Sequence, residues 1–455
     1  MFNETKAQIR RCWSQSRLYR RMLTIAGIFA VARLLLHLML LAGTIMPGAE
    51  ADTALPDDLR IYLEAASNLQ QQSELYPPLP LERMEFYQYA PSYALAFTPF
   101  LWLPIPLTAL IHTLLHLAAY ALLYASWGRI FRRLGLERGV EALAWLLPLW
   151  LIFAPFWSDL GFLNVYILMA LAATLLIEAV LAENLGSSLL WLALILQTKP
   201  QWAFALAVPL FMGNHRFFLK LIVGSVVSYA AIAGVTMLAV GPAYGMEQYN
   251  SYFRLLTGIG SNYPWRTPDM PFLGYNHSIA QTAVYLFGNT PEALRLATVI
   301  KALILLPLGV LAARCLFRPA NGVNALFKLD LVFALYTAAF IWLDVVWELS
   351  LGIAVFTYLL ATTQDRKSRM LIWAAFLPYA LVDAWQVLSF FIFGPEIIAP
   401  GPYVLTDPSI YLPLTMVVAV AFYGLLMKRL WVAIGQPAAQ PVILAQPGLR
   451  TNKLS

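Results

Sequence analysis

Apolar residues follow one another in long runs along most of the chain, and the polar stretches between these runs are short. A transmembrane helix needs about 20 mainly apolar residues. The pattern therefore predicts an all-α, polytopic membrane protein with about 12 transmembrane helices. The predicted spans are 22–46, 106–127, 140–156, 163–182, 187–197, 200–212, 217–240, 292–316, 329–343, 347–362, 369–393 and 409–427.

Two regions of this pattern are ambiguous. A lysine followed by a proline, Lys199-Pro200, interrupts the apolar run 187–212. Proline removes a helical N–H, and a single lysine in hydrocarbon is costly. We therefore predict two short helices here, with Lys199 at the turn on the outer face. The segment 90–105 is rich in proline, and we interpret it as bent and interfacial or re-entrant, leaving open whether it crosses the membrane.

Basic residues cluster between the predicted spans, and cytoplasmic loops of membrane proteins carry an excess of Lys and Arg. Placing every basic cluster inside puts both termini in the cytoplasm and two large loops outside, 47–90 and 241–291. We expect one membrane domain over 1–427 and a polar, disordered cytoplasmic tail over 428–455.

Composition excludes several classes of protein. The 455 residues are 60% hydrophobic and 12% charged, against about 45–50% and about 25% in soluble proteins. This balance excludes a single water-soluble domain and a disordered chain, and the two cysteines, Cys12 and Cys315, exclude a disulfide scaffold. The sequence contains no Walker loop, HExxH or CxxC motif. Because the predicted cytoplasmic loops are short, they leave no room for a nucleotide-sugar domain. We also expect no nucleic-acid partner.

The first outer loop contains a predicted amphipathic helix. Apolar residues between 59 and 69 recur at helical spacing, which is typical of a helix lying on the membrane surface. Asp58 and Tyr62 lie one turn apart and share a face, whereas Asp57 points about 100° away from Asp58. In one interpretation, one aspartate of the pair caps the helix and the other is solvated. In the other, Asp57 caps the helix while Asp58 points into a cavity.

Short motifs along the chain form a recognisable series. They are Asp58-Leu-Arg-Ile-Tyr62, Phe86-Tyr-Gln-Tyr-Ala-Pro91, Gly161-Phe-Leu-Asn164, Thr198-Lys199-Pro200-Gln201 and Asn276-His277-Ser278. Their order and spacing resemble those of glycosyltransferase family 87, over roughly residues 22–300. Two positions depart from the family pattern: Phe162 stands in place of a glutamine, and the segment 342–348 lacks an expected histidine.

The resemblance implies a fold and an activity. It implies a GT-C membrane fold and an α-mannosyltransferase that takes mannose from a polyprenyl-phosphate donor and transfers it to a glycolipid or glycan acceptor. It also implies an active site at the outer face of a bacterial plasma membrane, with Asp58 as the acidic residue of the first outer loop. No cofactor is expected, and a divalent metal is neither expected nor excluded.

The residues of the chain fit this chemistry. A lipid phosphate is a good leaving group that needs no general acid, so one carboxylate that accepts the acceptor's proton is sufficient, and Asp58 is the candidate base. Cations would stabilise the charge that gathers on the phosphate. Single displacement would invert the configuration of the sugar, because no second carboxylate acts as nucleophile.

Other polar residues at the predicted outer face are candidates for supporting roles. The donor-phosphate candidates are Lys199, Arg266 and His277; the substrate-binding candidates are Tyr62, Asn164, Gln201 and Asn276; the secondary acidic candidates are Asp57, Asp344 and Glu348. Each also has a structural alternative: a snorkelling lysine, an arginine that orders its loop, a histidine satisfied within its loop, or polar groups that satisfy backbone at helix ends. Asp344 and Glu348 lie at a predicted outer turn, four residues apart, so we expect them to share a face.

Two other functions remain open at this point. A multispanning transporter or flippase also uses broken helices and buried charges, although the chain shows no second break matching Lys199-Pro200. A scaffold for oligosaccharide assembly would have no chemistry of its own.

Overall fold

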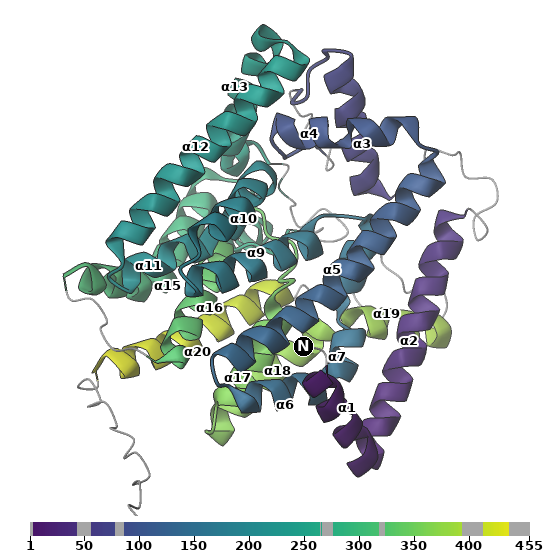
Figure 1. Ribbon diagram of the computed structural model, residues 1–455, viewed down its shortest axis with the longest axis vertical. Helices are drawn as coiled ribbons and strands as arrows, with labels where there is room; N and C mark the ends of the chain where they lie inside the picture. Colours follow the sequence, from purple (N-terminus) through teal and green to yellow (C-terminus); the bar gives the residue numbers. More distant parts are fainter. Residues whose placement is uncertain are drawn as a thin grey trace, which may run out of the picture.

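The computed structural model describes residues 3–42, 56–77, 86–263, 265, 276–317, 324–393 and 413–435. Within these ranges every regular element is an α-helix or a 3-10 helix (Figure 1). The all-α prediction is therefore confirmed.

Six of the described helices are long and apolar enough to cross a membrane. They are α2 (Arg17–Leu41), α5 (Ile105–Arg133), α12 (His215–Val240), α15 (Pro291–Phe317), α16 (Ala325–Trp342) and α20 (Leu414–Gly435). A seventh candidate consists of α6 (Glu137–Trp145) followed by α7 (Leu147–Leu151) and α8 (Ala154–Phe162), with a bend of 55°. The described residues thus give a membrane protein with six or seven candidate spans, and the predicted number of 12 is not confirmed.

Several of the other predicted spans are short or broken helices. These are α9 (Tyr166–Leu181), α10 (Leu185–Thr198), η3 (Pro200–Ala207) with α11 (Val208–Phe211), α17 (Gly352–Thr362), and α18 (Arg366–Ala380) with α19 (Val382–Phe393). The predicted break at Lys199 is confirmed, because this residue has an extended backbone, φ −137° and ψ 90°, as expected before proline. At the C-terminal end α20 continues past the expected boundary at 427, so the expected tail begins as helix.

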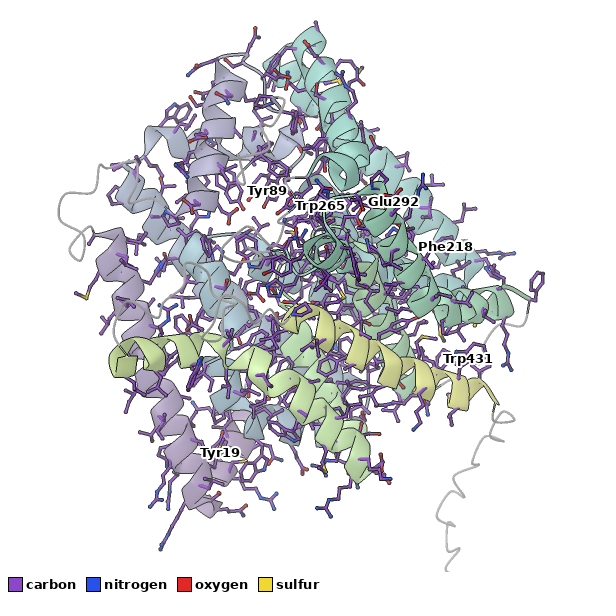
Figure 2. The ribbon with its side chains drawn as sticks, turned by 180° about the vertical axis from the view of Figure 1, so that it is seen from behind. Tyr19, Tyr89, Phe218, Trp265, Glu292 and Trp431 are labelled. Carbon is purple, nitrogen blue, oxygen red and sulfur yellow. The ribbon has the colours of Figure 1, made fainter. Side chains whose placement is uncertain are left out.

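Elements of the two predicted outer loops and of the proline-rich segment lie at one end of the molecule. Figure 1 shows α3 (Asp57–Gln70), α4 (Pro91–Phe97) and α13 (Pro242–Asn262) at this end, whereas α1 (Asn3–Gln15) and α6 lie toward the opposite end. In Figure 2, Tyr89 and Tyr19 mark the same two ends. The proline-rich segment forms α4 and the 3-10 helix η2 (Thr98–Trp102), and both pack against α3. It is therefore bent, as predicted.

Helix α3 has the amphipathic character expected from its sequence. Leu59, Tyr62, Ala66 and Leu69 are buried, whereas Gln70 is exposed. The buried side chains belong to the main hydrophobic core, which joins α3 to the long helices. This packing fixes the direction in which the first turn of α3 presents its polar residues.

Charges inside the apolar helices are paired. The Arg33 guanidinium on α2 donates to both carboxylate oxygens of Asp383 on α19, at 2.9 and 2.7 Å. Bidentate pairs of this kind are among the strongest hydrogen-bonded contacts, and intramembrane charges usually occur in pairs. This ion pair joins two helices that otherwise present much apolar surface outward.

A second ion pair joins α5 to α9, away from the predicted outer loops. Arg129 on α5 donates to Glu178 on α9 at 2.7 Å. The sequence predicts this end of both helices to be cytoplasmic, and the orientation itself remains a prediction.

Site-specific labelling would test the predicted orientation. In a variant without the native cysteines (Cys12→Ser, Cys315→Ser), we expect Gln70→Cys to react with a membrane-impermeant maleimide in intact cells. Ala182→Cys, in the exposed turn between α9 and α10, should react only after permeabilisation. Both positions are exposed, so differences in labelling report sidedness rather than burial. Equal labelling of both positions in intact cells would contradict the topology.

Candidate functional site

Lys199 lies in an aromatic cage where helix α10 ends. Its Nζ lies 4.5 Å from the centroid of the Tyr166 ring and 5.0 Å from that of the Tyr89 ring. Ammonium groups at such distances are attracted by the ring faces, more strongly when water is excluded. Only 9% of the residue is exposed. The cage thus stabilises a charge that the break in the helix brings into the protein interior.

The ammonium group has no hydrogen-bond acceptor among the residues that the structure describes. Burial lowers the pKa of Lys199 to about 8, while the negative charges of Asp58 and Asp159 act in the opposite direction. Lys199 lies between two short helices, outside the long candidate spans. Its three N–H donors are therefore available to an anionic ligand.

Asp58 lies in the first turn of α3 and faces a cluster of tyrosines. We call Tyr62, Tyr89, Tyr93 and Tyr166 the tyrosine cluster. Burial raises the pKa of Tyr89 well above its usual value, and the charge of Asp58 adds to this effect. Because Asp58 acts on both Tyr89 and Lys199, the structure brings together an acid and a cation that lie far apart in the sequence.

The predicted capping role of Asp57 is wrong. Pro56 occupies the N-cap position of α3, and no side chain caps the helix. Instead, Asp57 accepts a hydrogen bond from Arg60 at 3.1 Å, one turn along the helix. The two adjacent carboxylates thus have different surroundings, as their angular separation on a helix requires.

Asn164 connects the tyrosine cluster to the membrane helices. Its Oδ1 accepts hydrogen bonds from the hydroxyls of Tyr62 at 3.1 Å and Tyr89 at 3.3 Å, and from the Val165 N–H at 2.7 Å. The two hydroxyls also lie 2.9 Å from each other. The predicted substrate-binding residues Tyr62 and Asn164 are therefore bonded to one another, and they hold Tyr89 against Lys199.

Asp159 and His116, which the sequence did not single out, lie beneath this network. The Asp159 carboxylate accepts the backbone N–H groups of Tyr166 at 3.0 Å and Ile167 at 2.9 Å, and so caps α9. The His116 Nε2 lies 3.5 Å from Asp159 Oδ2 and also contacts the carbonyl of Asn164. The sequence did contain a signal that could have identified them. Each is an ionisable residue inside an apolar run, and such a residue usually marks a functional or paired site.

The predicted substrate-binding residue Asn276 is bonded to backbone groups. Its Nδ2 donates to the Asp344 carbonyl at 2.9 Å, and its Oδ1 accepts from Val346 N–H at 3.0 Å and Ser278 N–H at 3.1 Å. Burial lowers the pKa of the neighbouring His277 to about 3, so its imidazole is neutral at physiological pH. A neutral ring does not favour the predicted role of His277 as a phosphate-binding cation.

Asp344 and Glu348 do not share a helix face, contrary to expectation. The segment between α16 and α17 is not helical, so the four-residue spacing does not align them. Asp344 forms an ion pair with Lys301 on α15. Glu348 is buried and accepts a hydrogen bond from the Tyr379 hydroxyl at 2.6 Å, and burial raises its pKa to about 8. Glu348 is therefore mainly protonated at neutral pH and is a poor proton acceptor there.

The structure gives less information about the two remaining candidate residues, Gln201 and Arg266. Gln201 is half-buried in the first turn of η3, next to Lys199 and Pro200, and Arg266 lies outside the described residues. Within the described ranges, no group of three or more His, Cys, Asp or Glu side chains could hold a metal ion.

Comparison with known proteins identifies a family. The model of glycosyltransferase family 87 matches residues 87–343, which is more than half of the chain and includes Tyr89, Asn164 and Lys199. No curated protein and no solved structure matches the chain.

The hydrogen bonds of Asn164 predict a measurable contribution to stability. Asn164→Ala removes the acceptor that two buried tyrosine hydroxyls and the Val165 N–H share. One hydroxyl can turn to the other, 2.9 Å away, but the remaining donors are left unsatisfied, and we expect a loss of about 2 kcal/mol or more in the free energy of unfolding. Thermal unfolding of the purified protein would measure this loss as a lower Tm. Gln71→Ala, at the exposed end of α3, is the control and should change Tm little. A similar Tm for both variants would show that the Asn164 bonds do not stabilise the fold.

Proposed function

The chain belongs to glycosyltransferase family 87, and from this premise we propose that it transfers mannose from a polyprenyl-phosphate donor to a hydroxyl of a glycolipid or glycan. Family membership makes it a membrane glycosyltransferase that uses a sugar donor and an acceptor. We further propose that transfer takes place at the extracytoplasmic face of a bacterial plasma membrane.

The observation that carries this proposal is the buried Lys199 ammonium, on which the negative charge of Asp58 acts. A lysine that is enclosed by aromatic rings, yet has no acceptor among the described residues, is suited to bind a phosphate. When the bond between the sugar and the phosphate breaks, negative charge accumulates on the phosphate. A preorganised cation stabilises that charge more in the transition state than in the bound donor.

In the proposed mechanism Asp58 is the general base. The acceptor hydroxyl gives its proton to the Asp58 carboxylate, and its oxygen forms a bond to the anomeric carbon of the sugar. The bond from that carbon to the phosphate oxygen breaks, and polyprenyl phosphate leaves with the electron pair. One displacement inverts the anomeric configuration. Asp159 is less suited to this role, because its carboxylate accepts two backbone N–H groups.

An apolar groove next to Lys199 supports a lipid-linked donor. Helices α4, α9, α10 and α12 line a groove of about 1260 Å³, open side included. Its lining includes Tyr93, Leu168, Trp191, Leu194, Thr198 and Ile232. Thr198 directly precedes Lys199, so a hydrocarbon chain in the groove would bring its phosphate to the ammonium group.

Replacing Asp58 tests the proposed base. We expect Asp58→Asn to reduce sugar transfer from polyprenyl-phosphate mannose by about 10²–10⁴-fold, because the amide cannot accept the proton. Transfer by the purified protein in lipid nanodiscs, with radiolabelled donor, would measure this.

The neighbouring carboxylate provides a matched control. Asp57→Asn removes the same charge one residue away, and we expect transfer within about twofold of the unmodified protein. Near-normal transfer by Asp58→Asn would refute the role of Asp58 as base. Movement of the donor across the bilayer without any transfer would instead indicate a flippase.

The role of Lys199 predicts a pH dependence. Raising the pH through about 8 removes its proton, so kcat/KM for the donor should fall by roughly tenfold per pH unit above that value. Lys199→Arg keeps a charge at every accessible pH and should abolish this fall, whatever its maximal rate. A pH profile measured between 6 and about 10 tests both expectations. The same fall in both proteins would show that another group titrates.

A further inference from the structure

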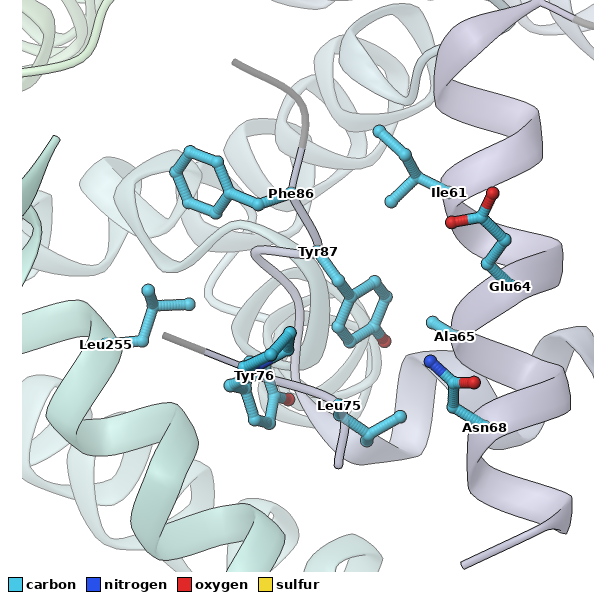
Figure 3. A pocket seen from close by; sticks show the side chains of 10 residues that line it. Ile61, Glu64, Ala65, Asn68, Leu75, Tyr76, Phe86, Tyr87 and Leu255 are labelled. Carbon is cyan, nitrogen blue, oxygen red and sulfur yellow. The ribbon is translucent and has the colours of Figure 1, made fainter. Parts of the chain in front are cut away.

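One face of α2 forms a groove, which we call the α2 groove. Trp13 of α1 lies at this groove, and the rest of its lining belongs to α2: Leu23, Thr24, Gly27, Ile28, Val31, Ala32 and Leu35. The α2 groove has room for about 550 Å³, which is within the range of ligand sites. The pocket between α3 and α13, whose lining is drawn in Figure 3, has room for only about 60 Å³.

A glycine makes the hollow in this face of α2. A Cβ atom added at Gly27 would meet nothing within 4 Å. The lining residues Ile28, Val31 and Leu35 are all more than half exposed. Arg33, whose ion pair joins α2 to α19, points about 160° away from Val31 around the helix. The α2 groove therefore faces away from the protein, toward the lipid that would surround a spanning helix.

Three arginines continue this face toward the N-terminal end of α2. Arg20 and Arg21 precede Thr24 by about one turn and Arg17 precedes it by two, so all three lie on the side of the groove. Arg17 and Arg21 are exposed, and Arg20 is half-buried. None of their side chains has an ion-pair partner in the part of the chain that the structure describes. No Asp or Glu occurs between residues 5 and 49, so this segment does not neutralise their charge.

This combination suits a phospholipid with an anionic headgroup. The lining residues 23–35 cover about 18 Å of helix axis, close to the roughly 15 Å of hydrocarbon in one leaflet. Guanidinium groups form bidentate hydrogen bonds with phosphate oxygens, and basic residues next to a spanning helix attract anionic lipids. Trp13 is 43% exposed, and its amphipathic ring is typical of the boundary between membrane and water. An acyl chain in the groove would therefore end beside the arginines.

Charge disfavours two other occupants of the α2 groove. A zwitterionic headgroup would bring its ammonium group beside three arginines, and residues 5–41 contain no carboxylate to receive it. A second copy of the chain would have the same orientation in the membrane. A symmetric contact along this face would therefore place arginines against arginines.

We propose that the α2 groove binds an anionic phospholipid, with its phosphate at Arg17, Arg20 and Arg21 and one acyl chain along residues 23–35. In the predicted topology this lipid belongs to the cytoplasmic leaflet, on the side opposite to the proposed transfer site. The inference does not depend on the proposed function, because neither a sugar donor nor an acceptor takes part in it.

Lipid titrations followed by native mass spectrometry test the proposal. The probes are phosphatidylglycerol and phosphatidylcholine with identical acyl chains, added to the delipidated full-length protein in detergent. We expect the first phosphatidylglycerol to bind with a Kd about tenfold or more below that of phosphatidylcholine. The triple variant Arg17→Gln/Arg20→Gln/Arg21→Gln should lose this preference, because it lacks the charges that distinguish the two headgroups.

A second variant tests the groove while keeping every charge. Gly27→Leu places a side chain where the acyl chain would lie, so we expect phosphatidylglycerol to bind about fivefold more weakly or worse. Gly309→Leu is the matched control on α15, where an added Cβ atom also meets nothing within 4 Å. Its Kd should equal that of the unmodified protein.

A charge control separates this site from general attraction between anionic lipids and basic residues. Arg366→Gln/Lys367→Gln/Arg369→Gln removes the same charge from exposed positions at the start of α18, and it should keep the preference for phosphatidylglycerol. Loss of the preference in both triple variants, equal Kd values of the two lipids for the unmodified protein, or unchanged binding in Gly27→Leu would overturn the inference. If the first triple variant fails to insert into the membrane, Gly27→Leu decides alone.

Discussion

The carboxamide of Asn164 is the contact on which the arrangement of the site depends. Its oxygen accepts hydrogen bonds from Tyr62 on α3 and from Tyr89 in the segment before α4. These two segments lie far from Asn164 in sequence, and the bonds at its oxygen join both of them to the start of α9. If Asn164 moved, Tyr89 would lose its position against Lys199, and α3 would lose the anchor that directs Asp58 toward the same space.

Burying charged groups at the site costs free energy, and neighbouring groups in the structure offset this cost. Asp159 receives two backbone N–H groups and faces His116, and Lys199 lies against two ring faces. Each charge is thus stabilised without a direct ion pair between Lys199 and a carboxylate among the described residues. A closed Lys–Asp pair would occupy the donors that a phosphate needs. The arrangement therefore leaves the ammonium group able to bind an anionic ligand.

Local sequence patterns gave correct predictions where the structure depends only on residues a few positions apart. The amphipathic spacing after Asp58 gave α3, and Lys199-Pro200 gave the helix break, because both depend on backbone geometry within a few residues. The same reasoning failed for Asp344 and Glu348, since it assumed a helix where the chain is irregular. The predicted number of 12 spans is not confirmed, because several apolar runs, such as that of α9, form helices shorter than the six or seven candidate spans among the described residues.

The sequence by itself determined that the chain is a helical membrane protein, where its main helix break lies, and which acid and lysine are candidates for chemistry. The first two properties follow from hydrophobic periodicity and from the geometry of proline, whereas Asp58 was singled out by the resemblance to glycosyltransferase family 87. Only the tertiary structure decided which polar residues meet: Asn164 with two tyrosines, Asp159 with His116, and Glu348 with Tyr379. Such contacts join residues separated by tens of positions or more, and a hydrogen bond depends on three-dimensional packing that no local pattern records.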